Sequence, residues 1–108
     1  MLANGAIQNN RADAGLVRLD LKPVVKLFTP DASCTWLLTE IDPIRPDIAF
    51  GLCDLGLGSP EIGSVQLSEI ATIRGRLGLS VERDIYFRPE KRLSVYAEEA
   101  FHLGYVWA

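Results

Sequence analysis

The sequence predicts an α+β fold: a mostly antiparallel sheet of about five strands with two short helices on one face. Short runs rich in β-branched and aromatic residues follow one another through connections that are too short for crossover helices. After residue 67 the apolar spacing changes from that of a strand to that of a helix, and a second helical stripe ends the chain. The 108 residues, 48% of them hydrophobic, suit a single α+β domain over residues 21–108.

Residues 1–20 are expected to form an irregular or partly mobile arm with room for one helical turn. Asn4-Gly5 and Asn9-Asn10 interrupt any apolar periodicity, and the stretch from Arg11 to Asp20 is polar with scattered apolar residues. The domain is therefore expected to begin after this arm.

Four strands are predicted next, at Val24–Phe28, Thr35–Ile41, Ile48–Asp54 and Ile62–Leu67. Prolines follow the first two strands closely, and proline cannot donate a hydrogen bond to a strand ladder. Because the connections are short, an antiparallel meander is the simplest topology.

The bend from Asp54 to Gly63 separates the third and fourth strands. Its glycines and Pro60 suit a tight reversal, and the carboxylates of Asp54 and Glu61 flank it. A dinucleotide-binding loop would have to open onto a helix, whereas the segment after this bend alternates like a strand. A glycine-rich hairpin is therefore expected.

Two helices are predicted in the second half of the chain. The first covers Ser68–Arg74, with Ser68 as its N-cap and Gly75 as a left-handed residue after its end. The second begins near Ser94, a plausible cap, and carries an apolar stripe formed by Leu93, Tyr96, Ala97, Ala100, Phe101 and Gly104. The apolar tail Tyr105–Ala108 either docks on the domain or exposes an aromatic residue.

Between these helices, Val81–Phe87 is predicted to be the fifth strand. Its alternation turns Arg83 towards the core together with Ile85 and Phe87. A guanidinium in such a position needs a carboxylate partner, and Asp54 or Glu61 is expected to supply it.

The composition argues against several functional classes. The net charge of −3 and pI of about 5.0 disfavour binding to nucleic acid through phosphate neutralisation. With two cysteines and one histidine, the chain offers few ligands for a metal ion, and no metal or cofactor is expected. No stretch is long and apolar enough to span a membrane and no signal peptide is recognisable, so we expect a cytoplasmic protein with reduced thiols.

No catalytic residue is assigned from the sequence, and two pairings of reactive side chains are available. Cys34 or Cys53 with His102 is the available thiol–imidazole pair, but nothing in the sequence places them within reach. Asp54 and Glu61 are a carboxylate pair that a small hydrolase would need in a cleft.

Basic and aromatic residues alternate near the predicted fifth strand. Arg83, Arg88, Lys91 and Arg92 lie close to Tyr86 and Phe87, a pattern that can stack on and neutralise single-stranded nucleic acid. The alternative is a solvated strand end before a helix, which the overall negative charge favours.

Five motifs follow one another along the chain: Val24-Val25-Lys26-Leu27-Phe28, Trp36-Leu37-Leu38-Thr39-Glu40, Phe50-Gly51-Leu52-Cys53-Asp54-Leu55-Gly56, Pro60-Glu61-Ile62-Gly63 and Glu82-Arg83-Asp84-Ile85-Tyr86-Phe87. In this order they resemble the DUF2958 family of small bacterial proteins of unknown function. The similarity spans about residues 2 to 100. It implies an accessory protein of a plasmid, conjugative element or phage, and it transfers no catalytic residues.

The first hypothesis is thus a non-enzymatic protein of a mobile genetic element that binds a protein partner, by analogy an inhibitor of host defence such as an anti-CRISPR or anti-restriction protein. A single-stranded nucleic-acid-binding accessory protein is the alternative, and a small hydrolase is the third. Trp107 in an exposed tail also suggests a homodimer. The candidate interaction residues are Asp54, Glu61, Glu82, Arg83, Asp84, Tyr86, Arg88, Lys91 and Arg92.

Overall fold

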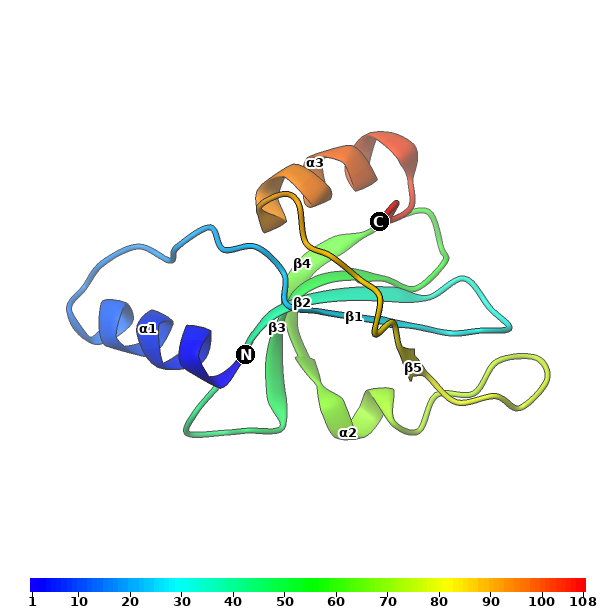
Figure 1. The fold of residues 1–108 in the computed structure, drawn as a ribbon, viewed down its shortest axis with the longest axis horizontal. Helices are drawn as coiled ribbons and strands as arrows, with labels where there is room; N and C mark the ends of the chain where they lie inside the picture. The colour runs from blue at the N-terminus through cyan, green and yellow to red at the C-terminus, as the bar shows by residue number, and fades with distance from the viewer.

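A computed structural model describes residues 1–108 and contains a five-stranded antiparallel sheet with three helices (Figure 1). The strands lie in the order β4-β3-β2-β1-β5. The predicted α+β class is confirmed. None of the helices combines the length and apolar character needed to cross a membrane. The elements are α1 (Leu2–Asp13), β1 (Val25–Phe28), β2 (Thr35–Ile41), β3 (Ile48–Asp54), β4 (Glu61–Gln66), α2 (Leu67–Ile70), β5 (Glu82–Arg83) and α3 (Leu93–Leu103).

The first four strands form the predicted meander, each pairing antiparallel with the next. The reversal between β3 and β4 is a glycine-rich hairpin, as expected. Gly56 and Gly58 have φ values of 77° and 83°, in the left-handed region that favours glycine. The path of the bend therefore depends on the left-handed backbone conformation of these two glycines.

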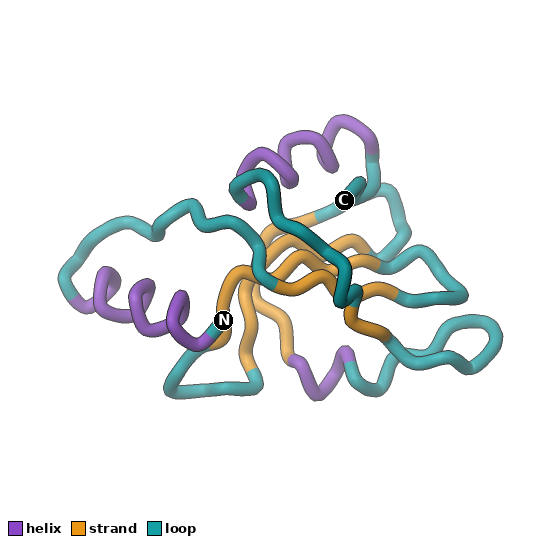
Figure 2. Tube along the Cα trace, in the orientation of Figure 1, coloured by secondary structure: helices purple, strands orange, loops and turns teal.

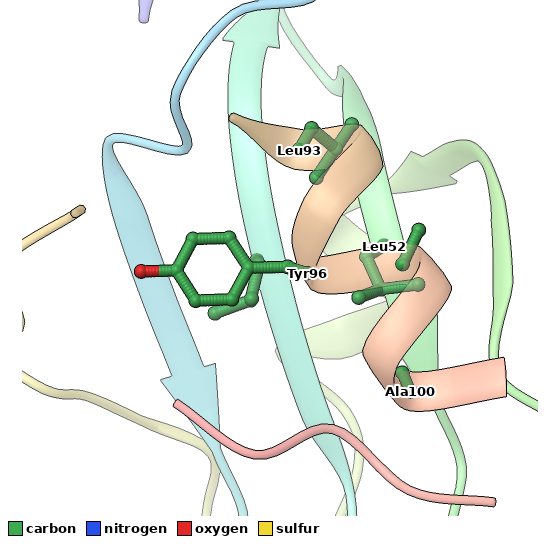
Figure 3. Packing of buried hydrophobic residues seen from close by; sticks show 6 residues of the cluster. Leu52, Leu93, Tyr96 and Ala100 are labelled. Carbon is green, nitrogen blue, oxygen red and sulfur yellow. The ribbon is translucent and has the colours of Figure 1, made fainter. Parts of the chain in front are cut away.

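Helices cover both faces of the sheet, so the expectation that they share one face was wrong. On one face, α3 buries Leu93, Tyr96, Ala97 and Ala100 against Leu37 and Leu52 (Figure 3). On the other, Ile70 of α2 packs with Trp36 and Leu38. Because β2 alternates large apolar residues towards both sides, each side needs a cover. The two helices accordingly lie on opposite sides of the sheet in Figure 1.

The N-terminal segment begins with α1, where an irregular arm over residues 1–20 was expected; the rest of the segment, after Asp13, is loop (Figure 2). Tertiary contacts hold this helix in place. The Asn4 side-chain amide donates to the Thr39 carbonyl (2.8 Å), and the Gln8 side chain bonds to the backbone of Leu19. Gly5 is buried against the Ile41 carbonyl, where a Cβ would overlap it. Asn4 and Gly5, which interrupt the periodicity, are thus among the residues that attach the helix.

The segment between β4 and α3 has less regular structure than predicted. The helix expected over Ser68–Arg74 is only the short α2, and Gly75 does not adopt the left-handed conformation. Gly75 instead lies against the carboxylate of Asp31, in the β1–β2 connection. This carboxylate occupies the space that a Cβ on residue 75 would need.

The predicted fifth strand is likewise reduced to Glu82–Arg83. The side chain of Asp84 accepts a hydrogen bond from the Tyr86 amide (2.9 Å), and its carbonyl accepts one from the Phe87 amide (3.2 Å). These bonds turn the chain away from β1 and end the strand.

The C-terminal helix forms as predicted, but its N-terminus is satisfied by a distant residue. Asp20 accepts hydrogen bonds from the Ser94 amide (3.0 Å) and the Ser94 hydroxyl, so Ser94 is not itself the cap. These bonds to Ser94 lower the pKa of Asp20. At the other end, Gly104 adopts the left-handed conformation with φ of 80°.

Candidate functional site

A depression of about 380 Å³ lies beside Tyr96 of α3, and we call it the aromatic hollow. It is built by two segments without regular structure, the chain that follows β5 and the C-terminal tail. Its lining consists of Asp84, Tyr86, Phe87, Arg88, Glu90, Lys91, Tyr96, Trp107 and Ala108.

The tail is held in place by residues of the sheet. The carboxylate of Asp54, 2% exposed at the end of β3, accepts hydrogen bonds from the Gly56 amide (2.8 Å) and the Val106 amide (2.9 Å). The Lys26 ammonium on β1 donates to the Ala108 carbonyl (2.7 Å) and lies 3.7 Å from the Asp84 carboxylate. Trp107 is therefore positioned between two anchored neighbours.

Inside the hollow, Tyr96 interacts with several residues around it. Its ring is tilted against Phe87, with 6.4 Å between the centroids, and its hydroxyl accepts a hydrogen bond from the Glu90 amide (3.1 Å). The Lys91 ammonium lies 5.4 Å from the centroid of the same ring. A hydrogen bond to Glu99 (2.8 Å) raises the pKa of Lys91.

Two large aromatic side chains of the hollow remain in contact with solvent: Tyr86 is 83% exposed and Trp107 is 68% exposed. Groups of both charges line the hollow with them: Asp84 and Glu90 are acidic, and Arg88 and Lys91 are basic. Such a surface can bury an apolar or aromatic group while its rim bonds to polar groups of either charge.

The structure brings together four of the sequence-predicted candidates, Asp84, Tyr86, Arg88 and Lys91, in this hollow. The other candidates lie elsewhere. Glu82 and Arg83 are exposed on β5, and Glu61 is exposed on β4. Arg92 donates to the Asp20 carbonyl (3.0 Å) at the start of α3.

The expected ion pair between Arg83 and either Asp54 or Glu61 was wrong. Glu61 lies on β4 and Arg83 on β5, which are opposite edges of the sheet, because β5 pairs with β1. Asp54 uses its two oxygens on backbone amides instead. Arg83 is exposed and does not point into the core as its alternation had indicated.

Trp107, Tyr96 and Lys26 belong to the site but were not among the sequence candidates. Trp107 had a signal, since an apolar tail with an aromatic residue suggested either docking or exposure. Tyr96 was predicted as a core residue of the last helix, and it is also the floor of the hollow. Nothing in the sequence indicated that Lys26 would hold the tail.

A buried acidic residue, Glu40, forms a second polar cluster on the sheet. The β2–β3 register shifts between Leu38 and Glu40, a bulge that turns Glu40 to the same face as its partner Phe50. Glu40 pairs with Arg18, whose guanidinium stacks 3.5 Å from the centre of the Phe50 ring. Gln8 also donates to Glu40, so this cluster joins α1 and the following loop to the sheet. A charged residue inside an apolar strand was the signal for it.

The remaining reactive side chains do not form a cluster. Cys34 and Cys53 are half-buried free thiols, and burial raises the pKa of Cys53. His102 is exposed near the end of α3. No three histidine, cysteine or acidic side chains lie together as metal ligands would.

The fold and the aromatic hollow define a small α+β protein with a partly apolar, charge-balanced surface depression. The chain belongs to DUF2958, a family of proteins of unknown function, whose model matches residues 1–107. No curated protein and no solved structure matches the chain.

Proposed function

We propose that the protein is a non-enzymatic accessory protein of a mobile genetic element that binds a protein partner through the aromatic hollow. The observation that carries this proposal is the pair of exposed aromatic side chains, Tyr86 and Trp107, at a depression of about 380 Å³. Tyrosine and tryptophan, with arginine, are the residues that most often dominate binding energy at protein interfaces. An apolar side chain of the partner would enter the hollow between them.

The charges around the hollow favour a protein over nucleic acid. Asp84 and Glu90 would face any phosphate backbone that approached Arg88 and Lys91. Lys91 is already paired with Glu99, and the whole chain carries a net charge of −3. A polypeptide can satisfy both signs of charge at the rim, whereas a phosphate chain can satisfy only one.

The class of partner follows from the resemblance to DUF2958 rather than from geometry. An accessory protein of a plasmid, conjugative element or phage acts in the cytoplasm of a host that defends itself against such elements. We therefore propose a component of a restriction or CRISPR system as the partner, and inhibition of that system as the outcome.

The test is a plating assay in which a host with an active restriction or CRISPR system expresses the protein while a targeted phage is titrated. We expect wild-type protein to raise plating, and the Tyr86→Ala and Trp107→Ala variants to lose most of that gain. Tyr105→Ala is the matched control, because Tyr105 is also exposed but does not line the hollow.

Binding by the purified defence component is then measured directly, with Kd expected to rise at least about tenfold for each hollow variant, a change of 1.4 kcal/mol. Unchanged affinity in both variants would refute the assignment of the hollow. Salt-sensitive binding to a single-stranded oligonucleotide, in the absence of protein capture, would favour the nucleic-acid alternative instead.

A further inference from the structure

The outer edge of the sheet formed by β4 carries backbone groups without partners in this chain. β4 pairs only with β3, in an unbroken register from Ile48↔Gln66 to Cys53↔Glu61. One step beyond this register, the Leu67 amide donates to the Asp47 carbonyl at 2.8 Å. Because hydrogen-bonded pairs alternate along an antiparallel ladder, Glu61, Gly63 and Val65 bond to β3. The amides and carbonyls of Ile62, Ser64 and Gln66 therefore point outwards.

The two edges of the sheet differ in how they are protected. The opposite edge, β5, has only two residues, Glu82 and Arg83, and both are charged. Short length and charge are the usual devices that prevent edge strands from pairing with other chains. β4 has six residues, a regular register, no proline, and a single charged residue, Glu61, at its first position. This edge therefore lacks the protection that the other edge has.

We propose that the β4 edge pairs antiparallel with the same edge of a second copy of this chain, around a two-fold axis at Ser64. The outward-facing residues then match one another, Ile62 opposite Gln66 of the second copy and Ser64 opposite its own counterpart. Such pairing forms up to about six backbone hydrogen bonds, two for each pair, and continues the sheet across both copies.

Side chains and charges on β4 suit a second copy in this register. Val65 of one copy lies opposite Gly63 of the other, and no atom lies within 4 Å of the position where a Cβ on Gly63 would be. Glu61 falls outside the paired stretch, opposite Leu67 of the second copy, so no two like charges face each other across the axis. The surface is independent of the aromatic hollow.

Sedimentation velocity on the full chain, from micromolar to submillimolar concentration, tests the proposal, with a dimer of twice the 11.9 kDa chain expected. Ser64→Lys places two ammonium groups opposite each other at the axis and should weaken the dimer at least about tenfold. Ser59→Lys is the matched control, because Ser59 is exposed in the preceding bend and outside the paired stretch. It should dimerise like the wild type.

Hydrogen exchange provides a readout that needs no variant. The amides of Ile62, Ser64 and Gln66 should become protected as concentration rises, while those of Gly63 and Val65 are protected at every concentration. A chain that stays monomeric throughout the range overturns the proposal. So does a dimer that Ser64→Lys leaves intact or that leaves the three outward amides unprotected.

Discussion

Asp54→Ala is expected to lower the free energy of unfolding by about 3 kcal/mol and to release the C-terminal tail. The buried carboxylate accepts one hydrogen bond within the hairpin bend, from Gly56, and one from the tail, at Val106. Hydrogen bonds to a charged group contribute about 1.5 to 3 kcal/mol each. We take the lower value for both, because removing a buried charge recovers some desolvation energy and the Val106 amide can reach water.

Chemical unfolding in urea measures the change in stability, and hydrogen exchange at the Val106 amide reports the tail separately. A domain of this size has about 5 to 15 kcal/mol of stability, so the variant should still fold. Asp54→Asn is the matched variant. It keeps one acceptor oxygen and can therefore serve only one of the two backbone amides, so it should lose about half as much stability.

The two readouts can refute this reasoning independently. A loss below about 0.5 kcal/mol in Asp54→Ala, the range of an ordinary surface substitution, would mean that the two hydrogen bonds do not stabilise the fold. A large loss with unchanged exchange at Val106 would mean that Asp54 supports the bend alone. In that case the tail, and with it Trp107, is positioned by Lys26 and by the packing of Val106 against the core under α3.

The other predictions concern loop packing, pH and thiol reactivity. Gly75→Ala should lower stability by about 1 to 3 kcal/mol, because its methyl group would overlap the Asp31 carboxylate. Asp31→Ala alone removes the hydrogen bond from the Leu77 amide, so in urea unfolding the test is the coupling: Gly75→Ala should cost less in the Asp31→Ala background than in the wild type. The lowered pKa of Asp20 contributes stability that is fully present above its unfolded pKa near 3.8 and is lost as pH falls through the lower folded pKa. The difference in unfolding midpoint between wild type and Asp20→Asn should therefore stay constant from pH 7 to about pH 5 and shrink as pH falls below 3.8. Because burial raises the pKa of Cys53, its alkylation at pH 8, followed by mass spectrometry, should be slower than in the urea-unfolded chain, and equal rates would contradict the burial.

Local sequence patterns were sufficient to predict the meander but not what covers it. β2 and β3 begin and end at the predicted residues, because turn residues bound both runs. The side of the sheet on which each helix lies depends on how both faces of β2 are filled, a tertiary property. Trp36 and Leu37 are adjacent in sequence and lie almost completely buried on opposite faces, which in hindsight indicates two covers.

The errors at β5 and α1 have a common physical origin. The alternation over Val81–Phe87 suited a strand, but the hydrogen bonds made by Asp84 turn the chain after two residues. In α1, Asn4 and Gly5 looked like helix breakers, yet their contacts with Thr39 and Ile41 attach the helix to β2. In each case a specific tertiary or side-chain contact outweighed an intrinsic propensity of a few tenths of a kcal/mol to about 1 kcal/mol per residue.

The candidate site was predictable only where its residues are close in sequence. The stretch containing Tyr86, Arg88 and Lys91 was recognisable as a basic–aromatic surface. The contribution of Trp107 to this surface was not recognisable. The tail that carries Trp107 is held by a hydrogen bond between Val106 and Asp54, which lie fifty-two positions apart along the chain. Asp54 and Arg83 do not meet because β5 pairs with β1, and both β1 and β2 lie between β5 and β3.

The two proposed surfaces lie towards opposite edges of the sheet, which has a consequence for binding. The aromatic hollow borders Lys26 on β1 and Asp84 just after β5, whereas self-pairing uses β4. A dimer joined through β4 would therefore leave both hollows open and present them as a pair. Against a partner with repeated copies of the target site, two hollows would bind far more tightly than one. Ser64→Lys should then weaken capture by a multimeric partner while leaving affinity for its isolated subunit unchanged, and equal losses for the two would show that the edge and the hollow are one surface.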